Sequence, residues 1–325
     1  MDVADAVVVG GGPAGSTCAW KLRNAGLDVV VLDQMAFPRT KLCAGWVTPE
    51  VMTDLELDHH DYPLSFMTFN KLHLHWKALS MQLKSRQHSI RRFEFDDFLL
   101  RRTGARILQH KVRDIRRDGK DYVLDGHFRC KYLIGAGGTA CPVYRTLFRE
   151  SSPRSSVLQT ATYEHEFAYD WEHGDCHLWF FDDGLPGYAW YVPKANGFIN
   201  VGLGGMADQV KHKGGSIQEY WRKFVNRLER RGLVRYDQYQ PTGYSYYLRG
   251  DVDVVSDNNS YLVGDAVGLA TRDMCEGIGP AVKSGLLAAK AIVTGSDYSL
   301  AGITMFSDGG LASKILERKF VGYQR

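Results

Sequence analysis

The sequence lacks the features that mark secreted, membrane-spanning, metal-binding or nucleic-acid-binding proteins. Its six cysteines are scattered and form no CxxC pair, which argues against a disulfide framework and against a zinc site. No apolar run reaches the roughly 20 residues that a membrane-spanning helix needs. The formal net charge is only +3, and the arginine clusters are interleaved with acids, so nucleic acid is not an expected partner. We expect a globular, cytoplasmic protein.

Histidines do not form a metal site in the sequence either. The two pairs are His59-His60 and His73-x-His75. Strand alternation would put His73 and His75 on one face, but no further ligand accompanies them. The sequence also contains no internal repeat and no low-complexity stretch. We therefore predict no metal cofactor.

What the sequence does contain is a dinucleotide-binding fingerprint over residues 5–33. A run of valines leads into Gly10-Gly11-Gly12-Pro13-Ala14-Gly15, followed by a helical stretch and a second apolar strand that ends on Asp33. Gly10 permits the tight turn, Gly12 lets the backbone approach a pyrophosphate, and Gly15 lets the helix pack on the strand. The carboxylate of Asp33 can accept the hydroxyls of an adenosine ribose. The chain is predicted to bind a dinucleotide.

Later segments favour a flavin over a nicotinamide dinucleotide. Residues 260–268 predict a short strand and a turn that carries Asp265, an acid suited to the ribityl hydroxyls of a flavin. Gly277-Ile278-Gly279 begins a helix, with Pro280 in its first turn. Such a helix start stabilises the pyrimidine edge of a flavin, which becomes anionic on two-electron reduction. Residues 131–138 predict a strand that returns to the first sheet.

Three stretches in this order, VVVGGGPAGS, YLIGAGG and YLVGDAVGLA, resemble flavoproteins of the para-hydroxybenzoate hydroxylase-like fold. Within that group the chain is most similar to the geranylgeranyl reductase family of FAD-dependent oxidoreductases. Residues 37–45 (FPRTKLCAG), 92–96 (RFEFD) and 186–194 (PGYAWYVPK) are similar to the family motifs FPRxKxCGG, RxxFD and PxxYxWxFPK. The sequence departs from these patterns at Ala44, which replaces Gly, and at Val192, which replaces Phe.

The resemblance implies an α/β fold, with a Rossmann-like FAD-binding domain and an inserted antiparallel β-sheet substrate domain. We expect the FAD-binding domain at residues 1–60, 90–150 and 255–295. Strand-like alternation, as in TATYEHEFA and GFINVGLGG, favours the sheet domain at residues 61–89 and 151–254. Residues 296–325 form a C-terminal segment. The sheet domain is expected to lie over the flavin.

The resemblance also implies which residues contact FAD, from its adenine to its isoalloxazine. Arg92 agrees with physical chemistry, because a guanidinium can pair with the phosphate oxygens. Val112 would offer only backbone contact to adenine. The implied FAD contacts are Gly10, Gly12, Ala14, Gly15, Asp33, Cys43, Ala44, Gly45, Arg92, Val112, Asp265, Gly277 and Ile278.

Candidate catalytic residues follow from the expected substrate cavity. Tyr188 and Trp190 are two apart on a predicted strand and share one face, which the resemblance puts against the isoalloxazine. Reduction of an isolated alkene needs a hydride at one carbon and a proton at the other, and the thiol of Cys43 is a candidate proton source. We predict Cys43, Tyr188 and Trp190 as catalytic residues. A redox pair formed by Cys43 and Cys275 is a further hypothesis.

The resulting functional hypothesis is an FAD-dependent reductase of C=C bonds. The many aromatic residues of the sheet domain suit an apolar, isoprenoid-like small molecule, with NADPH or ferredoxin as the electron donor. A flavin monooxygenase or halogenase on the same fold stays open, although Tyr188 stands at the first Trp of the halogenase motif WxWxIP. An electron-transfer flavoprotein that donates to a membrane quinone also stays open. Its peripheral membrane contact would use the apolar and basic residues 311–325.

Overall fold

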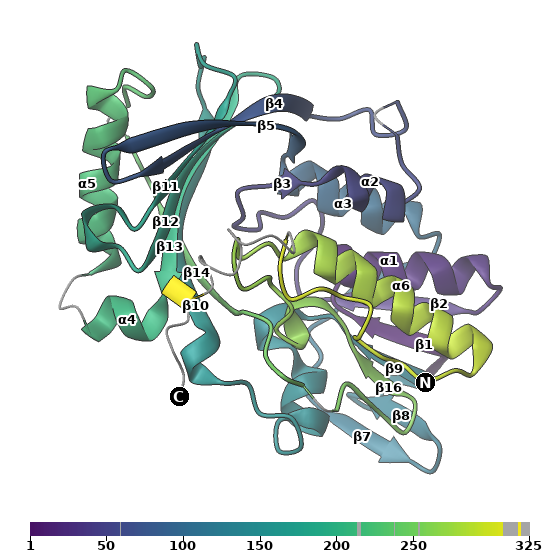
Figure 1. Ribbon diagram of the computed structural model, residues 1–325. Coiled ribbons are helices and arrows are strands. Elements are labelled where there is room, and N and C mark those ends of the chain that lie inside the picture. The colour runs from purple at the N-terminus through teal and green to yellow at the C-terminus, as the bar shows by residue number, and fades with distance from the viewer. Residues whose placement is uncertain (59, 213–215, 237, 253, 308–317, 320–325) are drawn as a thin grey trace. The chain divides into compact units, whose positions relative to one another are not determined.

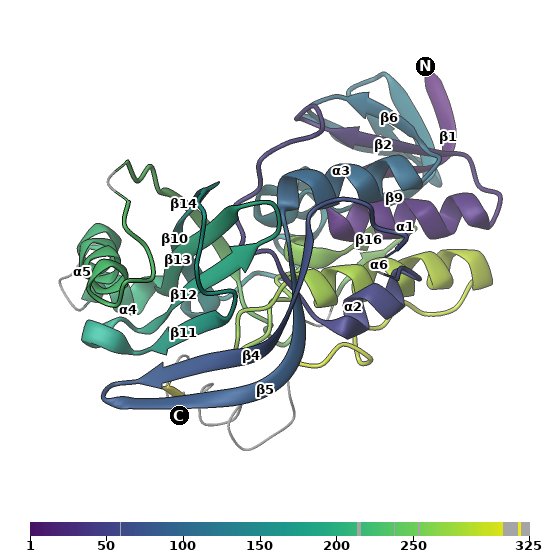
Figure 2. The same cartoon turned by 90° about the horizontal axis from the view of Figure 1, so that it is seen from above.

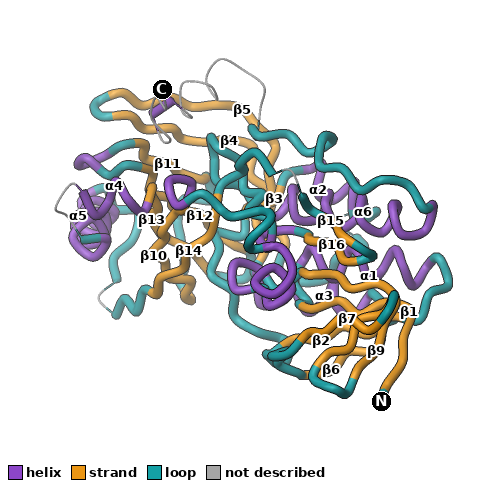
Figure 3. Tube along the Cα trace, turned by 90° about the horizontal axis from the view of Figure 1, so that it is seen from below, coloured by secondary structure: helices purple, strands orange, loops and turns teal. Residues whose placement is uncertain are grey.

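The computed structural model describes residues 1–58, 60–212, 216–236, 238–252, 254–307 and 318–319. Two features noted in the sequence lie outside these residues, namely His59 and the segment 311–317 with 320–325. The described residues divide into two compact units. Unit 1 contains residues 1–39, 95–155 and 247–307, and unit 2 contains residues 40–94 and 156–246. Each unit is built on a sheet of its own, whose strands are orange in Figure 3.

Unit 1 is a Rossmann-like α/β layer. Its parallel strands follow the order β16-β9-β1-β2-β6, with β15 antiparallel to β16 and the β7–β8 hairpin joined to β9 (Figure 1). Residues 6–9 of β1 and 29–32 of β2 are buried, as in strands that are covered on both faces. The strands are β1 (Asp2–Val9), β2 (Val29–Asp33), β6 (Arg106–Gln109), β7 (Ile115–Asp118), β8 (Asp121–Leu124), β9 (Phe128–Gly135), β15 (Ser256–Asp257) and β16 (Ser260–Leu262).

Two helices, α1 (Pro13–Asn24) and α6 (Ile278–Thr294), lie side by side in unit 1 (Figures 1 and 2). Their close approach depends on Gly285, because a Cβ there would lie 2.5 Å from the carbonyl oxygen of Ala14. The helix α6 ends at Gly295, which has a φ of +68°, the left-handed conformation that glycine commonly adopts at the end of a helix. A third helix, α3 (Arg92–Arg102), begins in unit 2 and continues into unit 1.

Unit 2 is a sheet of eight strands in the order β14-β10-β13-β12-β11-β4-β5-β3. Neighbouring strands from β10 to β11 are antiparallel, and so are those from β4 to β3. The strands are β3 (Trp46–Val47), β4 (Phe66–Trp76), β5 (Leu79–Ile90), β10 (Gln159–Ala168), β11 (Cys176–Phe180), β12 (Gly187–Lys194), β13 (Phe198–Met206) and β14 (Thr242–Tyr247).

One pair in this sheet is parallel, whereas the sequence predicts antiparallel pairing throughout. β4 pairs with β11 in parallel, with Leu72 opposite Cys176 and Trp76 opposite Phe180. A parallel pair needs a long crossover connection, and here about a hundred residues separate the two strands along the chain. The long hairpin of β4 and β5 thus joins the sheet through a non-local pairing (Figure 2).

The two faces of the unit 2 sheet differ in their cover. The amphipathic helix α5 (Ile217–Arg230) packs Trp221 and Phe224 on one face, where Trp179 is fully buried. Ser216 caps α5 by accepting a hydrogen bond from the backbone N–H of Glu219.

The remaining helices of unit 2 are α2 (Pro49–Asp54) and α4 (Ala207–His212). Among the described residues, no helix is both long and apolar enough to cross a membrane.

Candidate functional site

The glycine turn after β1 is formed by close backbone contacts that exclude side chains. Gly10 has a φ of +116°, and a Cβ there would lie 2.3 Å from the carbonyl oxygen of Ala136. A Cβ on Gly15 would lie 2.0 Å from the carbonyl oxygen of Gly10. Both glycines are therefore required by the turn itself, one for conformation and one for helix–strand packing.

Gly12 is required neither by the backbone conformation of the turn nor by the packing of the helix on the strand. Apart from its chain neighbours, the described part of the protein would bring one atom within 4 Å of a Cβ on Gly12, a guanidinium nitrogen of Arg39 at 3.5 Å. Gly12 is also the N-cap residue of α1, and no side chain caps this helix. The first N–H groups of α1 are thus left to an external acceptor, in a place where the helix dipole favours an anion. The turn fits the pyrophosphate of a dinucleotide.

Asp33, at the end of β2, is oriented by the same turn. Its Oδ2 accepts a hydrogen bond of 2.8 Å from the backbone N–H of Gly11, and its Oδ1 accepts one of 2.9 Å from Met35. Each carboxylate oxygen retains a second lone pair, which suits the hydroxyls of a ribose. The backbone of Asp33 also accepts from the N–H of His110. Val112 follows two residues later and is buried in the core of unit 1.

The residues predicted to contact the ribityl chain and the pyrimidine edge of the flavin lie on two neighbouring segments of unit 1. Asp265 belongs to the short turn Gly264–Ala266, whose first N–H donates to the hydroxyl of Ser284 at 2.9 Å. A Cβ on Gly264 would lie 2.8 Å from that of Ala14, so this turn packs directly on α1. A Cβ on Gly277 would lie 3.6 Å from Oδ1 of Asp265, which brings the start of α6 beside the acid.

Arg39 is a candidate functional residue that sequence reasoning missed. Its guanidinium, which a Cβ on Gly12 would approach to 3.5 Å, lies 3.4 Å from the carboxylate of fully buried Asp96. The signal was present, since Arg39 belongs to the FPRTKLCAG stretch and Asp96 to RFEFD. A cation held at the start of α1 adds to the attraction for phosphate.

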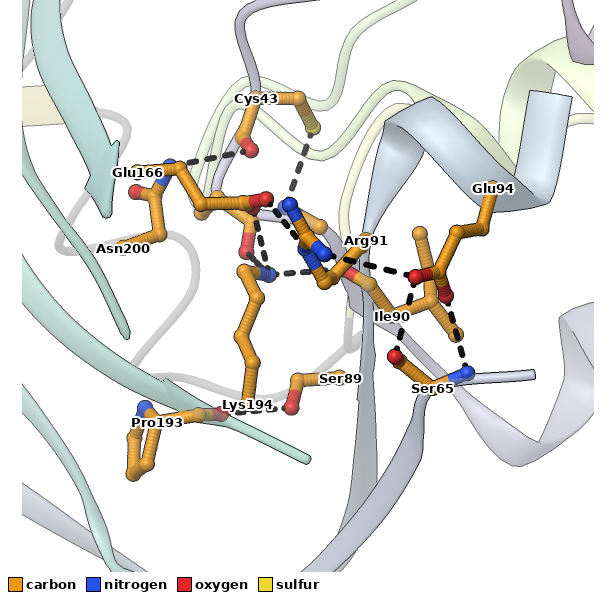
Figure 4. A network of polar contacts seen from close by, with 12 residues as sticks. Cys43, Ser65, Ser89, Ile90, Arg91, Glu94, Glu166, Pro193, Lys194 and Asn200 are labelled. Atoms are coloured by element: carbon orange, nitrogen blue, oxygen red, sulfur yellow. Dashed lines mark hydrogen bonds and ion pairs between the residues drawn. The ribbon is translucent and has the colours of Figure 1, made fainter. Parts of the chain in front are cut away.

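In unit 2, the loop of Cys43, Ala44 and Gly45 is fixed by a buried lysine (Figure 4). The ammonium of Lys194, fully buried at the end of β12, donates to the carbonyl oxygens of Ala44 at 2.5 Å and of Ile90 at 2.7 Å. Burial lowers the pKa of Lys194, while the carboxylate of Glu166, 3.8 Å away, acts in the opposite direction. Sequence reasoning quoted Lys194 in a motif but assigned it no role.

Trp190 is joined to this loop through one amide side chain. Its indole N–H donates to Oδ1 of Asn200 at 2.7 Å, and the amide nitrogen of Asn200 donates to the carbonyl oxygen of Cys43 at 3.4 Å. Tyr188 lies on the same face. The centroid of its ring is 5.7 Å from the ring centroid of Trp190 and 5.5 Å from that of Phe180. The face opposite to α5 thus presents a row of three aromatic rings.

Charged side chains accompany this row. Arg91 pairs with Glu166 at 2.8 Å and with Glu94 at 3.4 Å, and Glu94 also accepts from Ser65 (Figure 4). Arg92 is buried at the start of α3, close enough to Glu164 of β10 to lower the pKa of that carboxyl. Burial nevertheless raises the pKa of Glu164 to about 8. The face therefore holds an acid that stays protonated at neutral pH.

The predicted site residues thus form one group in each unit. The phosphate turn, Asp33, Val112, Asp265 and the start of α6 belong to unit 1. Cys43, Ala44, Gly45, Arg92, Tyr188 and Trp190 belong to unit 2. Cys43 and Cys275 belong to different units, and a redox pair formed by them stays a hypothesis.

Comparison with known proteins matches two stretches of the chain to described domains. A model of the NAD(P)-binding Rossmann-like domain matches residues 8–79, and a model of the geranylgeranyl reductase catalytic domain matches residues 158–235. The chain is 30% identical over 336 residues to a menaquinone reductase of Mycolicibacterium smegmatis, covering 94% of this chain and 80% of the relative.

Solved structures share the fold at lower identity. A geranylgeranyl bacteriochlorophyll reductase-like protein of Thermoplasma acidophilum aligns with a TM-score of 0.77 and 18% identity, covering 98% of this chain and 83% of that one. A flavin-dependent halogenase aligns with a TM-score of 0.72 and 20% identity, covering 90% of this chain and 58% of the halogenase. The para-hydroxybenzoate hydroxylase-like fold predicted from the sequence is confirmed.

Proposed function

The chain belongs to the geranylgeranyl reductase family of flavin-dependent oxidoreductases, and we propose that it uses FAD to reduce a carbon–carbon double bond of a long apolar substrate. The observation that carries this proposal is the aromatic row of Phe180, Tyr188 and Trp190, which lies within the segment similar to the reductase catalytic domain. Tilted aromatic rings on one sheet face suit an unsaturated hydrocarbon chain better than a charged metabolite.

The cofactor contacts are assigned to unit 1. We assign the pyrophosphate to the turn of Gly10, Gly12 and Gly15, helped by Arg39, and the adenosine ribose to Asp33. Asp265 would hold the ribityl chain, next to the start of α6. FAD bound in this way supplies hydride-transfer chemistry. The open space at Gly12 and the uncapped start of α1 support this assignment.

The substrate contacts are assigned to unit 2. The apolar chain of the substrate would pack on Tyr188 and Trp190, whose rings exclude water from the double bond. Asn200 holds the indole of Trp190, and Lys194 holds the Cys43–Gly45 loop, so that both are in place before the substrate binds. The reaction also consumes a proton, for which the sequence predicts the thiol of Cys43.

The rival functions have less support. A monooxygenase or halogenase shares the fold, but a likeness at 20% identity concerns the fold alone. Tyr188 also replaces the first Trp of the halogenase motif. For an electron-transfer flavoprotein, the membrane contact would lie in residues outside those described. We keep NADPH and ferredoxin as candidate electron donors.

One anaerobic experiment tests the proposal. The protein is loaded with FAD, reduced with dithionite, and mixed with geranylgeranyl diphosphate or with a short-chain menaquinone. We expect the flavin to reoxidise without oxygen and the substrate to gain two hydrogens by mass spectrometry. Reoxidation only when oxygen is admitted, with oxygen consumed in proportion to substrate, would establish a monooxygenase instead. Reoxidation by the quinone without any mass gain in its side chain would point to electron transfer.

A further inference from the structure

Glu164 shares a sheet face with Trp190, and their side chains meet over a glycine. In the register of the sheet, Gly202 of β13 lies opposite both Glu164 of β10 and Trp190 of β12. A Cβ on Gly202 would lie 2.3 Å from the indole of Trp190 and 2.7 Å from the Cβ of Glu164. Because Gly202 has no side chain, the side chains of Glu164 and Trp190 can both occupy the space above it.

One oxygen of the Glu164 carboxyl is buried without a hydrogen-bond partner among the described residues. Only 2% of the residue is exposed, and its Oε1 makes no hydrogen bond to any described residue. Its strand neighbour Glu166 differs, since that carboxylate pairs with Arg91 at 2.8 Å and lies 3.8 Å from Lys194. Buried polar atoms are nearly always satisfied in folded proteins, so an unsatisfied one in a candidate site indicates a role toward a ligand.

The charged groups around Glu164 come from four elements. Lys194 of β12, Lys41 of the loop before β3, and Arg92 of α3 attract its negative charge, while Glu166 of β10 repels it. Burial outweighs the three cations and raises the pKa of Glu164 to about 8. The group therefore keeps its proton at neutral pH, and the nearby cations stabilise the carboxylate after the proton has left.

We propose that Glu164 is the catalytic acid that protonates the substrate. This inference rests on the proposed function, which assigns the double bond to the surface of Trp190. When bound and reduced, FAD would supply the hydride for one carbon of the double bond, whose π bond would break as that C–H bond forms. The O–H bond of Glu164 breaks, and its proton forms the second C–H bond. The resulting carboxylate regains a proton from water before the next turnover.

The kinetic test uses Glu164→Gln with two matched variants. Glu166→Gln changes the neighbouring carboxylate of the same strand, and Cys43→Ser changes the competing acid. Each protein is loaded with FAD, reduced anaerobically with dithionite and mixed with geranylgeranyl diphosphate or a short-chain menaquinone. The rate of flavin reoxidation is measured between about pH 7 and pH 9, around the raised pKa of the acid.

We expect the wild-type rate to fall as the pH rises through about 8, where Glu164 loses its proton. Glu164→Gln should reoxidise on the order of 10² to 10⁴ times more slowly at neutral pH, without that alkaline decline. Glu166→Gln and Cys43→Ser should keep the decline. A Glu164→Gln protein with the wild-type rate and pH profile overturns the proposal. The proposal is also overturned if the alkaline decline in the reoxidation rate is lost in Cys43→Ser alone. That result would identify the thiol of Cys43 as the proton donor.

A second readout does not depend on activity. Infrared difference spectroscopy of the flavin-loaded protein should show the C=O band of a protonated carboxylic acid at neutral pH. The band should be present in wild type and Glu166→Gln, absent in Glu164→Gln, and lost as the pH rises through about 8. Absence of the band from the wild type at neutral pH overturns the proposal even if the Gln variant does not fold. A wild-type flavin that neither probe reoxidises contradicts the proposed function instead.

Discussion

The ammonium nitrogen of Lys194 lies 2.5 Å from the carbonyl oxygen of Ala44, although 150 residues separate them along the chain. This hydrogen bond fixes the loop predicted to lie beside the flavin to the end of the strand that carries Tyr188 and Trp190. The same ammonium also holds Ile90, the last residue of β5. One buried cation thus sets the positions of three chain segments in unit 2.

Gly45 makes that arrangement possible, and Gly45→Ala should destabilise the protein by about 2–4 kcal/mol. Its Cβ would lie 2.2 Å from the carbonyl oxygen of Ile90 and 2.5 Å from the ammonium of Lys194, at a φ of +65°. Gly119→Ala is the matched control, because Gly119 has a φ of +63° and no neighbour within 4 Å. The control should lose only about 1 kcal/mol. Urea unfolding measures both, and equal losses would show that the contact with Lys194 does not matter.

Gly12→Val should abolish most FAD binding while leaving the fold intact. In the free protein the Cβ of the new side chain would lie 3.5 Å from the flexible guanidinium of Arg39, and the side chain would fill the space assigned to the pyrophosphate. We expect at least about a tenfold loss of affinity, roughly 1.4 kcal/mol or more. Gly302→Val, at a glycine with open space around it, is the control. Flavin absorbance of the purified proteins and their melting temperatures are the measurements. Full FAD occupancy in the Gly12 variant would refute the assignment.

Trp190→Ala should change substrate recognition more than cofactor content. The substitution removes a large apolar surface from the proposed substrate face, so KM for geranylgeranyl diphosphate should rise on the order of tenfold or more. Trp221→Ala removes the same side chain from α5 on the opposite face of the sheet, where it packs in the core. That control should lose about 3–5 kcal/mol of stability without a selective effect on KM. Unchanged kinetics in a folded Trp190 variant would leave Trp190 a packing residue.

A histidine cluster in unit 2 should make the protein sensitive to acid. Burial lowers the pKa of His75 to about 4 and that of His177 to about 3, and the two rings share a hydrogen bond of 3.1 Å. Both are neutral in the folded state, whereas unfolded histidine binds a proton below about pH 6.5. Stability should therefore be complete above pH 6.5 and fall as the pH decreases toward 4, on the order of 2 kcal/mol.

The variant His177→Gln tests this cluster. It should flatten the decline in urea midpoint between about pH 7 and pH 4.5, because one of the two groups that gain protons on unfolding is gone. His127→Gln, at an exposed histidine in unit 1, should leave the decline unchanged. Identical pH profiles for the two variants would exclude a contribution from the buried imidazoles.

The sequence by itself determined the Rossmann-like half of the fold. The turn at Gly10, the helix after it, Asp33 at the end of β2 and Gly295 at the end of α6 depend on local conformation and periodicity, which neighbouring residues specify. The alternation of side chains along the strands of unit 2 is equally local, and it placed Tyr188 and Trp190 on one face of their strand. The resemblance to the reductase family followed from motifs of this kind.

Only the tertiary structure decided which side chains share the environment of those motifs. Lys194 meets Ala44, Glu164 meets Trp190 over Gly202, and His177 joins His75 through a parallel strand pair. These contacts join residues that are far apart along the chain, and a periodic pattern gives the face of a residue but not its partner on the next strand. The charge state of Glu164 depends on burial by all of those neighbours together, and burial is a property of the packed sheet rather than of the strand that carries the acid.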